Sequence, residues 1–158
     1  MKNTKLVLLA AALAPLGLLG AGLYFQHIEY MLPCPLCVIQ RYAFALIALM
    51  CLLGVALPRA ASRLFAGLGM LAALSGAGVA IYHLWVMANP AVQCGRDPLE
   101  TALNSFPSAT LLPFLFKAEG LCTTEYEPIL GLSMPLWALI WFVGFSVVLG
   151  ALAFKRGR

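Results

Sequence analysis

Two cysteines three residues apart, in the sequence PCPLCVIQR at residues 33–41, are the side chains of this chain best suited to chemistry. A disulfide between Cys34 and Cys37 would close a very small loop, which removes little entropy from the unfolded chain and stabilises a fold poorly. Cysteine pairs with this spacing usually exchange electrons instead. The spacing therefore predicts a redox-active pair.

Pro35 predicts that a helix begins at the pair, because proline fits the first helical turn, where its missing N–H costs nothing. Cys34 would be the N-cap and Cys37 would lie in the first turn. The unpaired N–H groups and the positive end of the helix dipole would stabilise the thiolate form of both sulfurs. Arg41 follows Cys37 by one turn and would stabilise its thiolate further. The alternative for Arg41 is an interfacial anchor whose charge reaches the lipid headgroups.

The other three cysteines are spread along the chain. Cys94 and Cys122 lie between the third and fourth apolar runs, and Cys51, in the middle of the second, is interpreted as a small core residue. A zinc site made of both pairs, with Cys34 and Cys37, is disfavoured because 27 residues separate the second pair, whereas a zinc knuckle has two to four. No metal site is predicted.

The composition is that of a membrane protein. Hydrophobic residues make up 63% of the 158 residues and charged residues only 10%, whereas an ordinary soluble domain has about 25% charged residues. The net charge of +4 is interpreted as a signal of membrane orientation, and no nucleic acid is expected as a partner.

Four apolar runs are long enough to cross a bilayer, which needs about 20 helical residues. The first is interpreted as an uncleaved helix, because it is longer than the apolar part of a signal peptide and contains no clean cleavage site. The chain is therefore predicted to be one membrane domain with spans at residues 6–25, 38–57, 64–87 and 134–154.

The positions of lysine and arginine predict the orientation, since these residues are retained on the cytoplasmic side. Seven of them flank the ends of spans on the side of both termini. Residues 1–5, 58–63 and 155–158 are thus predicted to be cytoplasmic, with periplasmic loops at 26–37 and 88–133. Cys34, Cys37, Cys94 and Cys122 would then face the compartment in which disulfides persist.

The predicted fold is an all-α, four-transmembrane-helix bundle with two extracytoplasmic loops. Small residues recur every four positions in the third span, from Ala72 through Gly76 to Ala80 and from Gly69 through Ala73 to Ala77, and such ridges let helices approach closely in lipid. The apolar stretch 106–118, interrupted by Pro107 and Pro113, is too short to span and is expected to form a short interfacial helix in the second loop.

An electron acceptor that dissolves in lipid is favoured, because the sequence contains neither a G-x-G-x-x-G turn for a dinucleotide nor a C-x-x-C-H motif for haem. A membrane quinone could reach the outer ends of the second and third spans. His83 is the remaining polar side chain at that depth and is a candidate contact for the quinone. The alternative for His83 is an ordinary interfacial hydrogen bond.

The ordered set of these residues resembles the DsbB family, the quinone-dependent thiol oxidases of the inner membrane of Gram-negative bacteria. The resemblance covers nearly the whole chain. It lies in FQH before the first loop, PCPLCVIQR, the histidine near the end of the third span, the two separated loop cysteines and GLSMPLW at the start of the fourth span.

The resemblance implies two redox-active disulfides, Cys34–Cys37 and Cys94–Cys122. A reduced periplasmic thiol oxidase of the DsbA type would attack Cys94, and the released Cys122 would attack Cys34. Cys37 would then transfer electrons to ubiquinone or menaquinone through a charge-transfer or covalent adduct.

The resemblance further implies that Arg41 stabilises the negative charge at the quinone, with His83 close by. Two alternatives remain open at this point. The chain could be a paralogue with its own dedicated partner, or a non-catalytic membrane protein whose loops are only held by disulfides.

Overall fold

The computed structural model of the chain describes residues 2–89, 91, 98–124 and 126–154. These residues form helices and no strand longer than an isolated bridge. The predicted all-α class is therefore confirmed. The helices in chain order are α1 (Lys2–Ile28), α2 (Pro35–Ala56), α3 (Arg59–Ala88), α4 (Pro98–Asn104), α5 (Pro107–Leu111), α6 (Pro113–Phe116) and α7 (Met134–Phe154).

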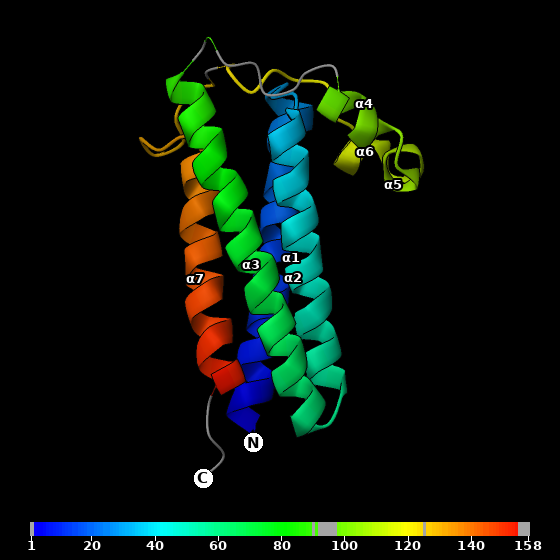
Figure 1. Cartoon of the computed structure of the whole chain (residues 1–158), viewed down its shortest axis with the longest axis vertical. Coiled ribbons are helices and arrows are strands. Elements are labelled where there is room, and N and C mark those ends of the chain that lie inside the picture. Colours follow the sequence, from blue (N-terminus) through cyan, green and yellow to red (C-terminus); the bar gives the residue numbers. More distant parts are fainter. Residues whose placement is uncertain (1, 90, 92–97, 125, 155–158) are drawn as a thin grey trace.

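Four of these helices, α1, α2, α3 and α7, are long and apolar enough to cross a membrane. They lie side by side in one bundle, with the start of α1 and the end of α7 at the same end (Figure 1). Large aliphatic side chains such as Leu64 and Val147 remain exposed on the outside of the bundle, as expected for a surface that faces lipid. The predicted four-helix membrane bundle is confirmed.

The short helices α4, α5 and α6 lie at the opposite end of the bundle from the start of α1 (Figure 1). Where a single interfacial helix was expected, the stretch 106–118 forms two short helices, α5 and α6, preceded by α4. Pro107 and Pro113 are the first residues of α5 and α6. Proline has no N–H for a preceding turn but fits the first turn of a new helix, so it divides this segment.

Within the bundle, α3 packs against both α2 and α7, whereas α1 packs mainly against α2 and barely touches α7. The predicted small-residue ridges form the tight contacts of α3. Gly76 lies directly against the ring of Phe142, and Gly69 lies against Leu149. Phe142 in turn stacks on Phe44 of α2, with 4.1 Å between the ring centroids. All four long helices contribute buried residues to one core, in which α3 makes the closest contacts.

The substitution Gly76→Ala should destabilise this packing, because a Cβ at this position would overlap the Phe142 ring. Overpacking of this kind costs roughly 1–3 kcal/mol, so the melting temperature in detergent, followed by tryptophan fluorescence, should fall. Gly78→Ala is the matched control on the same helix, since nothing lies within 4 Å of its Cβ position. Equal melting temperatures for the two variants would contradict this packing.

Candidate functional site

The pair Cys34 and Cys37, predicted to be redox-active, lies at the start of α2, with the local geometry that the sequence predicted. Cys34 is the N-cap and Pro35 occupies the first turn. The Cys34 Sγ accepts a hydrogen bond from the backbone N–H of Cys37 at 3.3 Å, and the two Sγ atoms lie 2.8 Å apart. Both residues are free thiols in this structure. They are close enough to interconvert between dithiol and disulfide with small side-chain movements.

The two thiols are not equivalent. Cys34 is only 2% exposed, whereas Cys37 is partly exposed. The hydrogen bond that the Cys34 thiol donates to Cys37, followed by burial, raises the pKa of Cys34 well above its usual value. The backbone N–H groups at the helix start favour a thiolate on Cys34, as expected, but the hydrogen bond to Cys37 and burial outweigh them, so the expected lowering of its pKa does not occur. The proton stays on Cys34 because it is shared with its neighbour and the site excludes water.

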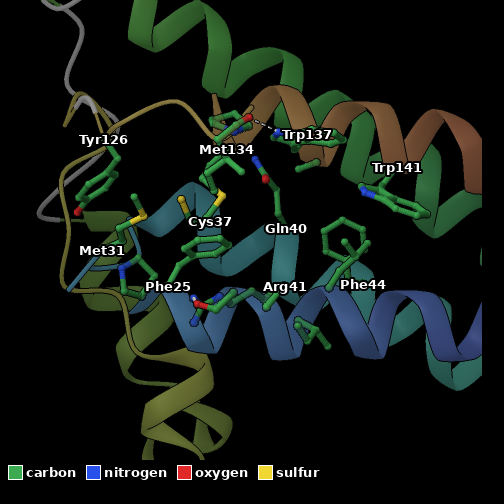
Figure 2. Close-up of a pocket in the computed structure, with 18 of the residues that line it drawn as sticks. Phe25, Met31, Cys37, Gln40, Arg41, Phe44, Tyr126, Met134, Trp137 and Trp141 are labelled. Carbon is green, nitrogen blue, oxygen red and sulfur yellow. Dashed lines mark hydrogen bonds between the residues drawn. The ribbon is translucent and has the colours of Figure 1, made fainter. Parts of the chain in front are cut away.

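A cavity of about 290 Å³ lies beside Cys37, between α1 and α7, and α2 forms a third side of it. It exists because α1 and α7 hardly contact each other. Cys37, Gln40 and Arg41 border the cavity from α2, facing aromatic residues of α1 and α7 (Figure 2). The other side chains that line it are almost all apolar, and the aromatic ones include Phe25, Phe44, Trp137 and Trp141. Cys34 is not among the lining residues that the structure describes.

Arg41 connects three parts of the structure around this cavity. Its guanidinium donates hydrogen bonds to the Gln26 side-chain oxygen of α1 at 2.7 Å and to the Leu115 carbonyl oxygen of α6 at 2.9 Å. A longer contact of 3.4 Å reaches the Gly22 carbonyl oxygen. Arg41 thus lies beside Cys37 at the cavity, as predicted, and its orientation depends on α1 and on the second loop.

His83 lies on the other side of the cysteine pair. Its Nε2 is 3.7 Å from the Cys34 Sγ, and its Nδ1 is 3.4 Å from the Gln40 amide nitrogen. His83 borders a second, smaller cavity of about 40 Å³ together with Cys34, Cys37 and Cys122, and it is absent from the described lining of the larger one. The structure therefore brings His83 to Cys34 and separates it from Arg41, with Gln40 between the two sides.

Cys122 lies next to Cys34 and Cys37. It is disulfide-bonded and 2% exposed, and it shares a buried cluster with Cys34. The predicted site residue Cys94 lies outside the described residues. The structure therefore brings Cys34, Cys37, Arg41, His83 and Cys122 together, on two faces of one helix end.

Close contact between the two loops holds Cys122 in this place. The backbone N–H groups of Glu119 and Gly120 both donate to the Pro33 carbonyl oxygen at 3.0 Å. A Cβ at Gly120 would overlap the Leu32 carbonyl. Glycine is thus required by this close approach, which positions Cys122 two residues later.

The second loop is also attached to α2 by its short helices. Phe116 of α6 stacks on Tyr42, with 4.3 Å between the ring centroids, and the Tyr42 hydroxyl is hydrogen-bonded to Ser108 of α5. The Asn104 side chain closes the segment by pairing with both backbone groups of Ala118, at 2.8 and 2.9 Å. Large apolar side chains of α5 and α6, such as Leu111, point away from the protein, in agreement with an interfacial segment.

Three residues of this site were not identified as site residues from the sequence. Gln26 is within the FQH motif, which was noted only as a resemblance, and it is buried against Arg41. Gln40 is within the PCPLCVIQR motif, but no role was assigned to it, because that role depends on contact with α3. In the sequence, Gly120 is marked only by its position close to a cysteine.

Cys51 is buried in the main core, far from these groups in the fold, in agreement with its interpretation as a core residue.

The comparisons with known proteins point to one family. The family model described as Disulfide bond formation protein DsbB matches residues 4–152. A protein of Herminiimonas arsenicoxydans named Disulfide bond formation protein B is 58% identical over 156 residues, which cover 99% of this chain and 99% of that protein. Proteins of the same name from Ralstonia nicotianae and Cupriavidus necator are 45% and 43% identical, over 99% of this chain and 98% and 96% of their own lengths.

These matches extend along almost the entire chain and include both loops and all four long helices. The chain belongs to the DsbB family, the disulfide bond formation proteins.

Proposed function

We propose that this protein is a disulfide-generating quinone reductase, which reoxidises a periplasmic dithiol oxidase of the DsbA type and passes the electrons to a membrane quinone. The observation that carries the proposal is the two-sided environment of the cysteine pair. Cys37 borders the large apolar cavity, whereas Cys34 is buried in a cluster with Cys122. The pair can therefore exchange with a loop cysteine on one side and with a lipid-borne molecule on the other.

The volume and apolar lining of the larger cavity support the proposal that it binds the headgroup of a quinone such as ubiquinone or menaquinone. Its volume of about 290 Å³ is close to the lower end of the usual range for ligand pockets, about 300 Å³. Aromatic side chains such as Trp137 would pack on the flat ring, and the guanidinium of Arg41 would hold a ring oxygen. The quinone, when bound, accepts two electrons and two protons and leaves as the quinol.

The cysteines of this chain would transfer electrons by successive thiol–disulfide exchange. A thiolate of the reduced partner breaks the Cys94–Cys122 disulfide by bonding to Cys94, and Cys122 leaves as a thiolate. Cys122 then bonds to Cys34 and breaks the Cys34–Cys37 disulfide, so that Cys37 leaves as a thiolate on the side of the cavity.

Two further exchanges complete the cycle. The second thiolate of the partner then bonds to the partner sulfur that is joined to Cys94. The partner leaves with its own disulfide, and Cys94 is released as a thiolate. Cys94 re-forms the bond to Cys122 and frees Cys34. Oxidation of Cys34 and Cys37 back to the disulfide supplies the two electrons that reduce the quinone, so one partner disulfide is made per quinol.

His83 and Arg41 would act on different members of the pair. The Nε2 atom of His83 is near Cys34, where it can hold the proton that this sulfur gains or loses during exchange. Arg41 lies by the cavity, where negative charge collects on Cys37 and the quinone oxygens. A direct contact of His83 with the quinone stays a prediction from the sequence.

The proposed location is the inner membrane of a bacterium, with both termini cytoplasmic and the redox pair at the periplasmic surface. The arrangement in Figure 1 supports this, since the second loop lies at the end of the bundle opposite the start of α1. Lys5 and Arg63, near the starts of α1 and α3 at the other end, are of the kind that is retained on the cytoplasmic side.

Replacing Cys37 by serine should abolish quinone reduction, because no thiol would then border the cavity from α2. The measurement is the loss of quinone absorbance when purified protein is mixed with quinone and a reduced DsbA-type partner. Cys51→Ser is the matched control, since this thiol lies in the core, and its turnover should equal that of the unsubstituted protein. Unchanged turnover in Cys37→Ser would refute the mechanism.

Gln26→Ala should weaken quinone reduction through Arg41. A hydrogen bond to a charged group contributes roughly 1.5–3 kcal/mol, so kcat/KM for quinone should fall by about tenfold or more. Exchange between the partner and the loop cysteines should continue at its normal rate. His27→Ala is the control, because His27 is the exposed neighbour of Gln26 in the same helix. This variant should behave as the unsubstituted protein. Equal kcat/KM values for the two variants would show that Gln26 does not position Arg41.

In the fully reduced protein, brief treatment with iodoacetamide near neutral pH should modify Cys37 before Cys34. The thiolate is the reactive form, and a raised pKa of Cys34 means that its thiolate becomes abundant only at higher pH. Labelling of Cys34 should therefore increase as the pH becomes strongly alkaline, as measured by mass spectrometry of the two positions. Faster modification of Cys34 at neutral pH would be inconsistent with the hydrogen-bond direction described above.

A further inference from the structure

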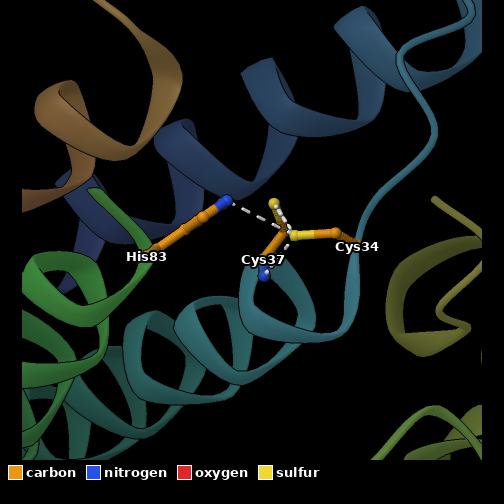
Figure 3. Close-up of side chains that lie close together, drawn as sticks. All are labelled: Cys34, Cys37 and His83. Atoms are coloured by element: carbon orange, nitrogen blue, oxygen red, sulfur yellow. Dashed lines mark hydrogen bonds between the residues drawn. The ribbon is translucent and has the colours of Figure 1, made fainter. Parts of the chain in front are cut away.

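Three side chains at the start of α2 and near the end of α3 form a cluster of metal-ligating atoms. The Sγ atoms of Cys34 and Cys37 and a ring nitrogen of His83 all lie within 4.8 Å of one another. In Figure 3 the imidazole points at the two sulfurs from the facing helix. Thiolates and imidazole are the ligands that zinc and similar ions prefer.

The spacing of the ligand atoms is near that of a tetrahedral site. With Zn–S of about 2.3 Å and Zn–N of about 2.0 Å, sulfur and nitrogen ligands are about 3.5 Å apart and two sulfurs about 3.8 Å apart. The distance from the Cys34 Sγ to the His83 Nε2 is 3.7 Å. The two sulfurs, at 2.8 Å, would have to separate by about 1 Å, which a small rotation of the partly exposed Cys37 side chain can supply.

The small cavity beside these atoms gives room for an ion. It has a volume of about 40 Å³, and Cys34, Cys37 and His83 all line it. A water molecule needs at least about 10–15 Å³ of such space, so an ion and one bound water fit. Cys34 and His83 are almost fully buried, and Val86 and Leu36 pack around the sulfurs, which protects metal bonds from competition by solvent.

Gln40 can orient the imidazole for metal binding. Its amide lies 3.4 Å from the His83 Nδ1, and rotating the amide by 180° exchanges its oxygen and nitrogen at nearly the same positions. With the oxygen facing Nδ1–H, the lone pair of Nε2 points at the sulfurs. Metal-binding histidines typically have such an acceptor on their second nitrogen.

We propose that the dithiol form of this protein binds one thiophilic divalent cation, of the Zn²⁺ class, through Cys34, Cys37 and His83, with water in the fourth position. Binding replaces the two thiol protons, which are released to solvent, and no oxidation state changes. The product of two thiolates, one imidazole and a doubly charged ion is neutral, which suits a site with little water. The disulfide form offers no thiolate and would not bind.

This site differs from the four-cysteine zinc site that the sequence disfavours, because its third ligand is a histidine supplied by α3. Its occupation depends on the redox state, and a bound ion would withdraw both thiols from exchange and oxidation. The proposal requires neither a quinone nor a partner protein, so its test is independent of the proposed function.

Cd²⁺ is a suitable probe, because its bonds to thiolates give an ultraviolet charge-transfer band. The full-length protein carrying Cys94→Ser and Cys122→Ser, reduced and freed of reductant, would be titrated with Cd²⁺ in detergent. One equivalent should bind with the charge-transfer band, and none should bind after oxidation of Cys34 and Cys37. Release of two protons per ion can be followed in weakly buffered solution.

The decisive comparison is between the two histidines of the chain. His83→Ala should raise the dissociation constant for Cd²⁺ by at least about tenfold, since even loss of an outer-shell partner typically costs 10–100-fold. His27→Ala, at the exposed end of α1, should leave it unchanged. His83→Cys should restore tight binding with a stronger charge-transfer band, which separates loss of a ligand from loss of folding.

Two results would overturn the proposal. The first is equal affinity in the unsubstituted background and in His83→Ala, which would mean that the cysteine pair binds the ion without the histidine. The second is the absence of a charge-transfer band in protein whose Cys34 and Cys37 react fully with a thiol reagent.

Discussion

The placement of one guanidinium among membrane helices constrains the end of the bundle that contains the Cys34–Cys37 pair. A charged group removed from water needs hydrogen-bond partners inside the protein. Arg41 obtains them from a side-chain amide of α1 and from backbone carbonyls of α1 and α6. No carboxylate pairs with Arg41 among the described residues. Its positive charge therefore remains available to negative charge that develops beside Cys37.

The same set of contacts links the two loops to the cavity. The Leu115 carbonyl that binds Arg41 belongs to the segment that also stacks Phe116 on Tyr42. A few residues later, the chain is bound to Pro33 through two backbone hydrogen bonds, and Cys122 follows. The position of the loop cysteine and the orientation of Arg41 thus depend on one docked segment, although they lie on opposite faces of the redox pair. Through this segment, movement of the second loop would change the orientation of Arg41 at the cavity.

The direction of electron flow that we propose depends on the inequivalence of two neighbouring thiols. Cys34 is buried, retains its proton and faces His83 and Cys122. Cys37 is partly exposed and borders the apolar cavity. Exchange with a protein thiol and electron transfer to a lipid-dissolved ring require different surroundings. The start of a helix at a membrane boundary can give each sulfur its own surroundings. Gln40 contacts both sides and separates them.

Much of this molecule follows from its sequence. Runs of about 20 apolar residues can satisfy their backbone in lipid only as helices, which determines the four-helix fold. Pro35 determines where α2 begins, so the cap at Cys34 and the position of Arg41 one turn beyond Cys37 were predicted correctly. The small residues at Gly69 and Gly76 likewise determine which face of α3 packs closely, because only that face allows another helix to approach.

The tertiary structure decided those features of the site that depend on contacts between segments and are absent from the local sequence pattern. The helix dipole at the start of α2 favours a thiolate on either sulfur, but burial and a proton shared with Cys37 keep Cys34 protonated, and the burial comes partly from α3 and the second loop, which are distant in sequence. The depth of His83 along α3 could be predicted from the sequence. The side of the cysteine pair on which His83 lies depends on how α3 is rotated against α2. Gln26 and Gly120 acquired their roles only when α1 and the second loop met α2, because a hydrogen bond or a close approach between distant segments exists only in the folded chain.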